Sequence, residues 1–200
     1  MPRRRPVARA ALTADPLEVA PFLLGKLLVC GTRAARIVEV EAYRGDADPA
    51  SHAYRGQTAR NATMFGRPGL LYVYFSYGMH WCANVVCGAE GVAGAVLLRA
   101  LEPVAGVAEM ASARAARRRA GSGLHERDIC RGPANLVVAL GITKEHDGVD
   151  LLAPGSPVRL LDDGAPLVEG RQLAHGPRVG ITKATDVEWR FWIAGSRCVS

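Results

Sequence analysis

The sequence has no long apolar run. A stretch of about 18 consecutive apolar residues, the length that crosses a bilayer, does not occur in its 200 residues. The N-terminal segment MPRRRPVARAALTADP also lacks the apolar stretch that follows the charges of a secretory signal. We therefore expect an intracellular, cytoplasmic protein that does not contact a membrane.

The motifs of several common enzyme classes are missing as well. The sequence has no G-x-x-x-x-G-K-[ST] loop, G-x-S-x-G elbow or H-E-x-x-H pair, which argues against P-loop, serine-hydrolase and zinc-protease chemistry. Its five histidines are scattered, and its five cysteines contain no C-x-x-C pair. We therefore expect no metal and no cofactor, and we interpret the cysteines as buried free thiols.

Lysine is scarce, although the chain is basic. Basic residues outnumber acidic ones by 25 to 19, and the formal charge of +6 suits a polyanionic partner such as nucleic acid. Only Lys26, Lys144 and Lys183 are lysines; the other 22 basic residues are arginines, which bind phosphate through two parallel contacts. The abundance of Ala, Gly, Arg and Val is equally typical of a genome rich in G and C, so both explanations remain open.

Hydrophobic periodicity predicts one domain whose core is mainly sheet. A length of 200 residues with 49% apolar composition suits a single domain. Asp15 and Pro16 form a helix-start signal that predicts a helix over Pro16–Leu28, bent at Pro21. Further helices are predicted over Val104–Ala120 and from Pro133 to Gly141. The strand period occurs in five segments, and short strands follow after Val158; the five are Leu27–Gly31, Arg36–Tyr43, Leu70–Tyr77, His80–Val86 and Gly94–Leu101.

Two segments lack such periodicity. Residues 1–14 carry Arg3, Arg4, Arg5 and Arg9, and are interpreted as a basic flexible N-terminal arm. Residues 44–69 form a loop of 26 residues rich in Gly, Pro, Asp, Asn and Ser. Loops of that length inside a domain are usually functional or disordered.

The strand over Arg36–Tyr43 carries two acids close together. With a side-chain period of two, Glu39, Glu41 and Tyr43 fall on one face, with the two carboxylates about 7 Å apart. Such a face borders either a polar cleft or open water. A cleft would raise the pKa of both acids, because each carboxylate opposes the ionisation of the other and burial adds to the effect.

A hairpin is predicted where the Leu70–Tyr77 and His80–Val86 strands meet. The connection Tyr77-Gly78-Met79 is short and has Gly at the turn. Tyr74 could line a cleft, while Tyr77 stands at the hairpin tip. Tyrosines on strands are most often ordinary packing residues, but one at the tip of a hairpin in a basic protein resembles a wedge that enters a DNA base stack.

Arg99 interrupts the apolar strand in GAVLLRALEP. Because arginine is almost never fully buried without a partner, this side chain requires an acid or a phosphate nearby. Glu39 and Glu41 are both candidate partners.

Six segments together resemble the alkyladenine (3-methyladenine) DNA glycosylase family of the mammalian type. The resemblance extends over residues 22–200 and rests on RIVEVEAYRG, SHAYRGQTARNATMF, PGLLYVYFSYGMHWCANVV, VLLRALEP, CRGPANL and RFWIAGS. It implies an α+β fold, a single mixed domain over residues 15–200 around a curved antiparallel β-sheet with flanking helices and no helix-hairpin-helix. It also implies base-excision repair, in which the enzyme hydrolyses the glycosidic bond of a damaged purine in double-stranded DNA and leaves an abasic site.

The resemblance also implies roles for individual residues. Glu41 would activate the attacking water as general base, and Arg99 would help to hold that water. The flipped base would lie in a pocket formed by Tyr43, His52, Tyr74, Asn84 and Leu97, while a wedge formed by Tyr77, Met79 and His80 would fill the gap in the duplex.

No lysine lies in these motifs, so we expect a monofunctional glycosylase without a Schiff-base step. We further expect a monomer, associated with the nucleoid of a bacterial cell. A non-catalytic nucleic-acid binding module on the same scaffold is the alternative.

Overall fold

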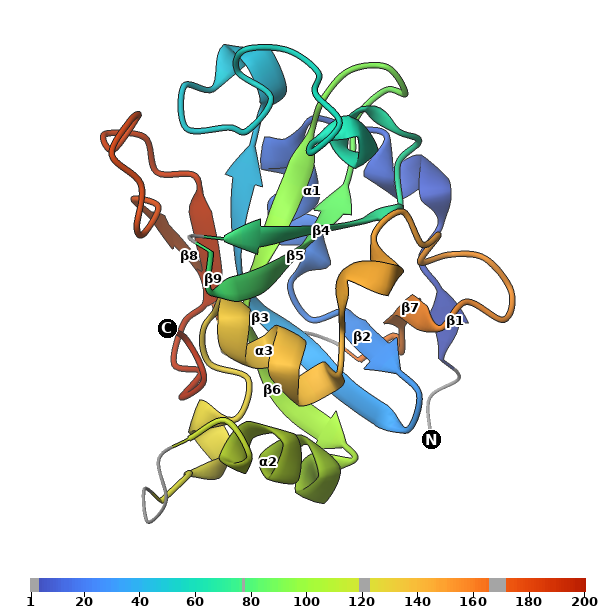
Figure 1. Ribbon diagram of the computed structural model, residues 1–200, viewed down its shortest axis with the longest axis vertical. Helices are drawn as coiled ribbons and strands as arrows, with labels where there is room; N and C mark the ends of the chain where they lie inside the picture. The colour runs from blue at the N-terminus through green and yellow to red at the C-terminus, as the bar shows by residue number, and fades with distance from the viewer. Residues whose placement is uncertain (1–3, 77, 119–122, 166–171) are drawn as a thin grey trace.

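Antiparallel strands build one curved sheet in the computed structural model, which describes residues 4–76, 78–118, 123–165 and 172–200 (Figure 1). Within these residues nine strands form the sheet, in the order β1-β7-β2-β3-β6-β5-β4, while β9 pairs with β3 and β8. The strands are β1 (Arg5–Pro6), β2 (Leu27–Cys30), β3 (Arg33–Tyr43), β4 (Leu71–Ser76), β5 (His80–Val86), β6 (Ala95–Ala105), β7 (Val158–Asp162), β8 (Leu173–Gly176) and β9 (Arg190–Ile193).

Helices pack against the central strands. The three α-helices of the described residues are α1 (Pro16–Leu23), α2 (Val107–Ala115) and α3 (Pro133–Leu140). Helix α1 packs against β3 and β6, α3 packs against β5 and β6, and α2 packs on α3. The predicted α+β domain around an antiparallel sheet is confirmed, and the described residues contain no helix-hairpin-helix. None of the described helices has the length and apolar character needed to cross a membrane.

Helix α1 ends earlier and helix α2 begins later than the sequence predicts, because the neighbouring residues pair as strands. Helix α1 ends at Leu23 rather than Leu28, because Leu27–Cys30 pair with β3 as strand β2. Strand β6 continues to Ala105, which pairs with Ala34, so α2 starts at Val107 and not at Val104. Between β6 and α2 lies Gly106 with φ 67°, a conformation that glycine adopts without steric cost.

The N-terminal segment corrects the prediction of a flexible arm. Residues Arg5–Pro6 pair with β7, and a 3₁₀ turn follows over Arg9–Leu12. Leu12 is fully buried in the main core, and the Arg9 guanidinium donates to both carboxylate oxygens of Asp150 at 2.8 and 3.1 Å. The prediction is wrong over residues 4–14 because these apolar contacts and the ion pair join the segment to the domain; residues 1–3 lie outside the described residues.

The long loop after β3 is ordered by its own side chains. It contains 3₁₀ turns over Gly45–Ala47 and Ala62–Phe65, and Met64 is buried in a small core of its own. The buried Asn61 amide donates to the carbonyl oxygens of His52 and Gly56 at 2.9 and 3.0 Å. These bonds fix the backbone that carries His52.

A buried ion pair joins this loop to the C-terminal tail, the segment over residues 172–200. Arg178 donates to the two carboxylate oxygens of Asp48 at 2.6 and 2.8 Å, and both side chains are fully buried. The same guanidinium donates to the Ala42 carbonyl oxygen at 3.0 Å and lies 4.6 Å from the ring centre of Tyr43. One arginine therefore holds the end of β3, the loop and the tail together.

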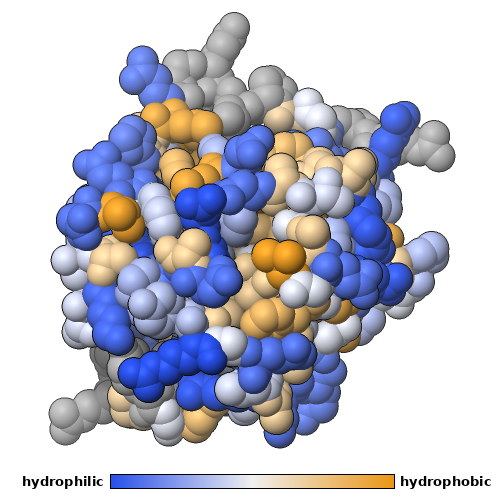
Figure 2. All heavy atoms as spheres, turned by 90° about the horizontal axis from the view of Figure 1, so that it is seen from above, coloured by the Kyte–Doolittle hydropathy of each residue, from blue (hydrophilic) through white to orange (hydrophobic). Residues whose placement is uncertain are grey.

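Hydrophilic side chains occupy most of the rim of the face shown in Figure 2, and apolar side chains lie between them. Among the large apolar side chains that are exposed are Tyr54, Phe75 and Met79.

Replacing Leu12 by Ala tests the correction at the N-terminus. Because Leu12 is fully buried, we expect Leu12→Ala to lower the free energy of unfolding by about 2–5 kcal/mol, measured by urea denaturation. Arg4→Ala, at an exposed position of the same segment, is the control and should change it by less than about 0.5 kcal/mol. A Leu12→Ala variant as stable as the wild type would restore the flexible arm.

A double-mutant cycle tests the link between Asp48 and Arg178. Since breaking a buried pair leaves an uncompensated charge, Arg178→Met should lower the free energy of unfolding by about 3–5 kcal/mol. The Asp48→Asn/Arg178→Met double variant should lose about 0.5–3 kcal/mol less than the sum of the single losses. Arg67→Met, which removes an exposed partner of Asp150, should cost about 0.2–1 kcal/mol. Strictly additive losses at residues 48 and 178 would show that the pair does not couple the two segments.

Candidate active site

Strand β3 carries two buried carboxylates at the centre of the sheet. Glu39 and Glu41 are both fully buried, which excludes open water as the reason for the two acids on one face. Strand β6 pairs with one edge of this part of β3, and β9 pairs with the other over Glu39–Glu41. The register with β6 shifts on either side of Glu39, an irregularity of the kind that redirects side chains next to active sites.

Arg99 of β6 lies between these carboxylates. Its Nε donates to Glu39 Oε1 at 3.0 Å, and its Nη1 lies 3.1 Å from Glu41 Oε1. The Arg99 side chain is 8% exposed, so the pairing takes place in a largely desolvated setting. The sequence offered Glu39 or Glu41 as partners of Arg99, and the structure gives it both.

Three donors surround the Glu41 carboxylate. Besides Arg99, the Val179 N–H donates to Oε1 at 2.8 Å and the Tyr43 hydroxyl donates to Oε2 at 2.9 Å. Burial raises the pKa of the Glu41 carboxyl, while the Arg99 charge and the bonds from Val179 and Tyr43 act in the opposite direction. A carboxylate has about four lone-pair sites, so one site of Glu41 stays available beside these three donors.

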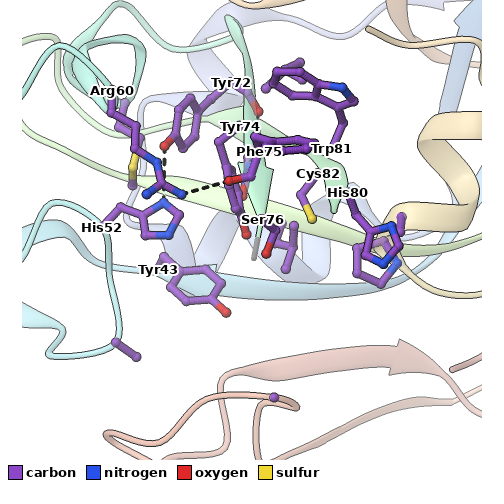
Figure 3. A pocket seen from close by; sticks show the side chains of 18 of the residues that line it. Tyr43, His52, Arg60, Tyr72, Tyr74, Phe75, Ser76, His80, Trp81 and Cys82 are labelled. Atoms are coloured by element: carbon purple, nitrogen blue, oxygen red, sulfur yellow. Dashed lines mark hydrogen bonds between the residues drawn. The ribbon is translucent and has the colours of Figure 1, made fainter. Parts of the chain in front are cut away.

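A cavity of about 1310 Å³ opens next to this group. Arg99, Tyr43 and Val179 line it, so Glu41 lies directly behind its wall. Figure 3 shows the labelled aromatic side chains grouped around the cavity, with His52, Tyr72 and Tyr74 from two segments pointing toward one another.

The rings of this group contact one another in fixed geometries. His52 meets Tyr74 edge-on with ring centres 4.5 Å apart, and Tyr72 stacks on Tyr74 at 5.4 Å. The Nδ1 atom of His52 lies 3.2 Å from the Tyr72 hydroxyl, a bond drawn in Figure 3. The walls therefore present both ring faces and ring edges to the cavity.

Partial removal from water favours the neutral forms of these rings. Burial, and then the nearby Arg60 charge, lower the pKa of His52 below its usual value, which favours the neutral imidazole. Burial raises the pKa of Tyr43 and Tyr74 well above their usual value, and that of Tyr72 to about 12. Neutral electron-rich rings of this kind attract cations through cation–π contacts.

The remaining residues expected in the pocket lie at its wall. Asn84 and Leu97 face each other in the β5–β6 register, and Leu97 also pairs with Glu41 in the β3–β6 register. Both side chains line the cavity, and the Asn84 amide donates to the Tyr72 carbonyl oxygen at 3.1 Å. Three adjacent strands thus place the acid and the pocket wall side by side.

The hairpin between β4 and β5 is confirmed, with Ser76 paired to His80. Met79 is 65% exposed at its tip, and His80 is exposed and lines the edge of the cavity. Tyr77, the residue expected to act as the wedge, lies outside the described residues.

The tail contributes residues that sequence reasoning missed. Residues 179–183 line the cavity, including Lys183, and Val179 binds Glu41 through its backbone. Arg178 reaches Asp48 across 130 positions of the chain, and no spacing pattern could link two residues so far apart. The one available signal is the isolated arginine in HGPRVG, which needed an acidic partner if it was buried.

Lys144 also lines the cavity, outside the motifs that suggested the site. Both Lys144 and Lys183 are exposed. In the described part of the chain, no three His, Cys, Asp or Glu side chains are grouped as metal ligands would be. All five cysteines are free, as predicted, and four of them are buried, whereas Cys30 is only partly buried.

Comparison with known proteins agrees with this geometry. The model of the family described as Methylpurine-DNA glycosylase (MPG) matches residues 10–197. A protein of Burkholderia lata is 54% identical over 194 residues, covering 96% of this chain and 89% of its own length. One of Burkholderia orbicola is 51% identical (97% of this chain, 90% of its own) and one of Rhodopseudomonas palustris is 50% identical (98% and 90%). All three carry names that refer to 3-methyladenine DNA glycosylase. The chain therefore belongs to the methylpurine-DNA glycosylase family.

Proposed function

We propose that this DNA glycosylase, a hydrolase of N-glycosyl bonds, flips an alkylated or deaminated purine, such as 3-methyladenine, out of double-stranded DNA. It then hydrolyses the glycosidic bond of that purine and leaves an abasic site. The observation that carries the proposal is the contact of Glu41 with Arg99 and Tyr43, directly behind a cavity walled by neutral aromatic rings. A buried acid beside an aromatic cavity with ample room for a purine suits the hydrolysis of a bond between a base and a sugar.

Glu41 would act as the general base. Arg99, Val179 and Tyr43 take three of its lone-pair sites, and the fourth would hold the attacking water. The water oxygen forms the new bond to the sugar carbon, its proton passes to Glu41, and the purine leaves with the electron pair of the glycosidic bond. Positioned base catalysis contributes about 10²–10⁴ to such a rate, and the carboxylate would also stabilise positive charge developing on the sugar.

The aromatic walls would select the base. Alkylated purines carry positive charge, and the faces of Tyr43 and Tyr74 favour a cation by about 0.5–2 kcal/mol. The neutral state of His52, which burial promotes, avoids repulsion of that cation. The weakened glycosidic bond of such a base requires little acid assistance.

Extrusion would require a side chain that fills the gap in the duplex. Taking a base out of the stack costs a few kcal/mol, and the cost is smallest where pairing is already damaged. Tyr77, aided by its neighbours Met79 and His80, is our candidate for this wedge. The 65% exposure of Met79 supports a tip that can reach DNA.

We further propose a glycosylase without lyase activity. A nucleophilic lysine needs a desolvated setting or a nearby cation, whereas Lys144 and Lys183 at the cavity wall are both exposed. A monomer bound to the nucleoid of a bacterial cell, with no metal and no cofactor, completes the proposal.

Release of purines from methylated duplex DNA tests this function directly. The wild-type protein should release methylated bases, and Glu41→Gln should reduce the single-turnover rate by about 10²–10⁴ while binding the same duplex with unchanged affinity. Chromatography of released bases gives the rate, and fluorescence anisotropy gives the affinity.

Glu109→Gln is the matched control, because Glu109 is an exposed acid whose side chain is 53% accessible, paired with Arg33. Its release rate should equal that of the wild type. Tight binding without any release by the wild type would indicate a non-catalytic binding module, and full activity of Glu41→Gln would refute the role of this carboxylate.

A further inference from the structure

Glu39 makes as many contacts as Glu41 and, like Glu41, is not itself among the residues that line the cavity. Its Oε1 accepts from Arg99 Nε at 3.0 Å and from Arg190 Nη1 at 3.2 Å, while its Oε2 accepts from the Ser200 N–H at 2.6 Å. The Ser200 hydroxyl in turn accepts from Arg99 Nη2 at 3.1 Å. The C-terminal end thus lies against β9 and the centre of the sheet (Figure 1).

These contacts fix the plane of the Arg99 guanidinium. Nε is held by Glu39, Nη2 by Ser200, and only Nη1 points to Glu41. Since the guanidinium is planar, holding two of its nitrogens determines where the third lies. Glu39 therefore sets the geometry of Arg99 without contacting the cavity itself.

The charges in this network balance. Glu39 and Glu41 face Arg99 of β6, and Arg190 of β9 pairs with Glu39. Glu41 also faces Tyr43 of β3, Tyr74 of β4, and Arg178 with the Val179 N–H of the tail, and the Arg178 charge is matched by Asp48. Two acids and two arginines remain, so removing the charge of Glu39, Arg99 or Arg190 leaves a net charge beside Glu41.

We propose that Glu39 is a positioning residue, which holds the Arg99 guanidinium so that Nη1 meets Glu41 and the attacking water. The proposal rests on the roles of Glu41 and Arg99 given above. Its electrostatic consequence follows from the charge balance. Loss of the Glu39 charge favours the ionised form of Glu41 and weakens it as a base, whereas loss of the Arg190 charge favours the protonated form.

Glu39→Gln is the first test. The amide has the shape of the carboxylate. In either orientation, however, its NH₂ group takes the place of one carboxylate oxygen and faces the N–H donors that bind that oxygen in the wild type. We expect the single-turnover release rate to fall about 10²-fold, the effect of a misplacement near 1 Å, with unchanged affinity for the duplex. The midpoint of the ascending limb of the pH–rate profile should move to lower pH.

Two variants serve as controls. Glu39→Asp keeps the charge and should recover part of the lost rate and the wild-type midpoint. Asp163→Asn removes a carboxylate that pairs with Arg36 at the other end of β3, and should leave both the release rate and the midpoint unchanged.

Arg190→Met provides the opposite shift. Arg190 is only partly buried, with an 18% accessible side chain, so we expect Arg190→Met to disturb the fold less than Glu39→Gln does. The midpoint of the ascending limb of its pH–rate profile should move to higher pH. At pH values above this limb, its release rate should be close to that of the wild type. A merely structural role of the network would not move the two midpoints in opposite directions.

A folded Glu39→Gln variant with the wild-type rate and midpoint would overturn the proposal. If Glu39→Gln does not fold, an Arg190→Met midpoint that is unchanged or lower would overturn it. Either result leaves the proposed function intact as long as Glu41→Gln is inactive. Activity in Glu41→Gln would instead refute the catalytic assignment itself.

Discussion

Arg99 is a largely buried cation on a central strand, and the structure around it is built to satisfy that charge. An arginine taken out of water loses hydration worth several kcal/mol, which only close carboxylates and further hydrogen bonds offset. Glu39 and Glu41 supply the carboxylates, and Ser200 supplies a further acceptor. The same contact joins β6 to β3 at the centre of the sheet and sets the polarity of the acid behind the cavity. The packing at the centre of the sheet and the proposed chemistry therefore depend on one group of atoms.

The C-terminal tail supplies hydrogen-bond partners for acids that are buried in β3 and in the loop after it. Arg178 ties the tail to the loop that carries His52, Val179 binds Glu41, and Ser200 binds Glu39. Each contact uses a group of the tail to satisfy a buried acid of β3 or of the loop after it. Because buried charges without partners are costly, these contacts hold the tail in place beside the aromatic wall of the cavity. The cavity is thus formed by segments that meet only in the folded chain.

Local patterns explain how far the sequence could predict this arrangement. The period of two placed Glu39, Glu41 and Tyr43 on one side of β3, and the Gly78 turn predicted the β4–β5 hairpin, as the structure confirms. The isolated Arg99 predicted an acidic partner. Contacts across long sequence separations, such as Asp48 with Arg178 or Glu39 with Ser200, leave no periodic trace. The order of residues 4–14 was missed because the segment has no apolar periodicity, while Leu12 and the Arg9–Asp150 pair, which hold it, depend on tertiary contacts.

Single-turnover release of methylated purines from duplex DNA by Arg99→Lys tests the central role of the Arg99 guanidinium most directly. Lysine retains the charge but not the planar set of donors, so it cannot meet Glu39, Glu41 and Ser200 together. We expect a rate about 10²-fold below that of the wild type, with unchanged affinity for the duplex. A folded Arg99→Lys variant that releases bases at the wild-type rate would contradict this role of the Arg99 guanidinium.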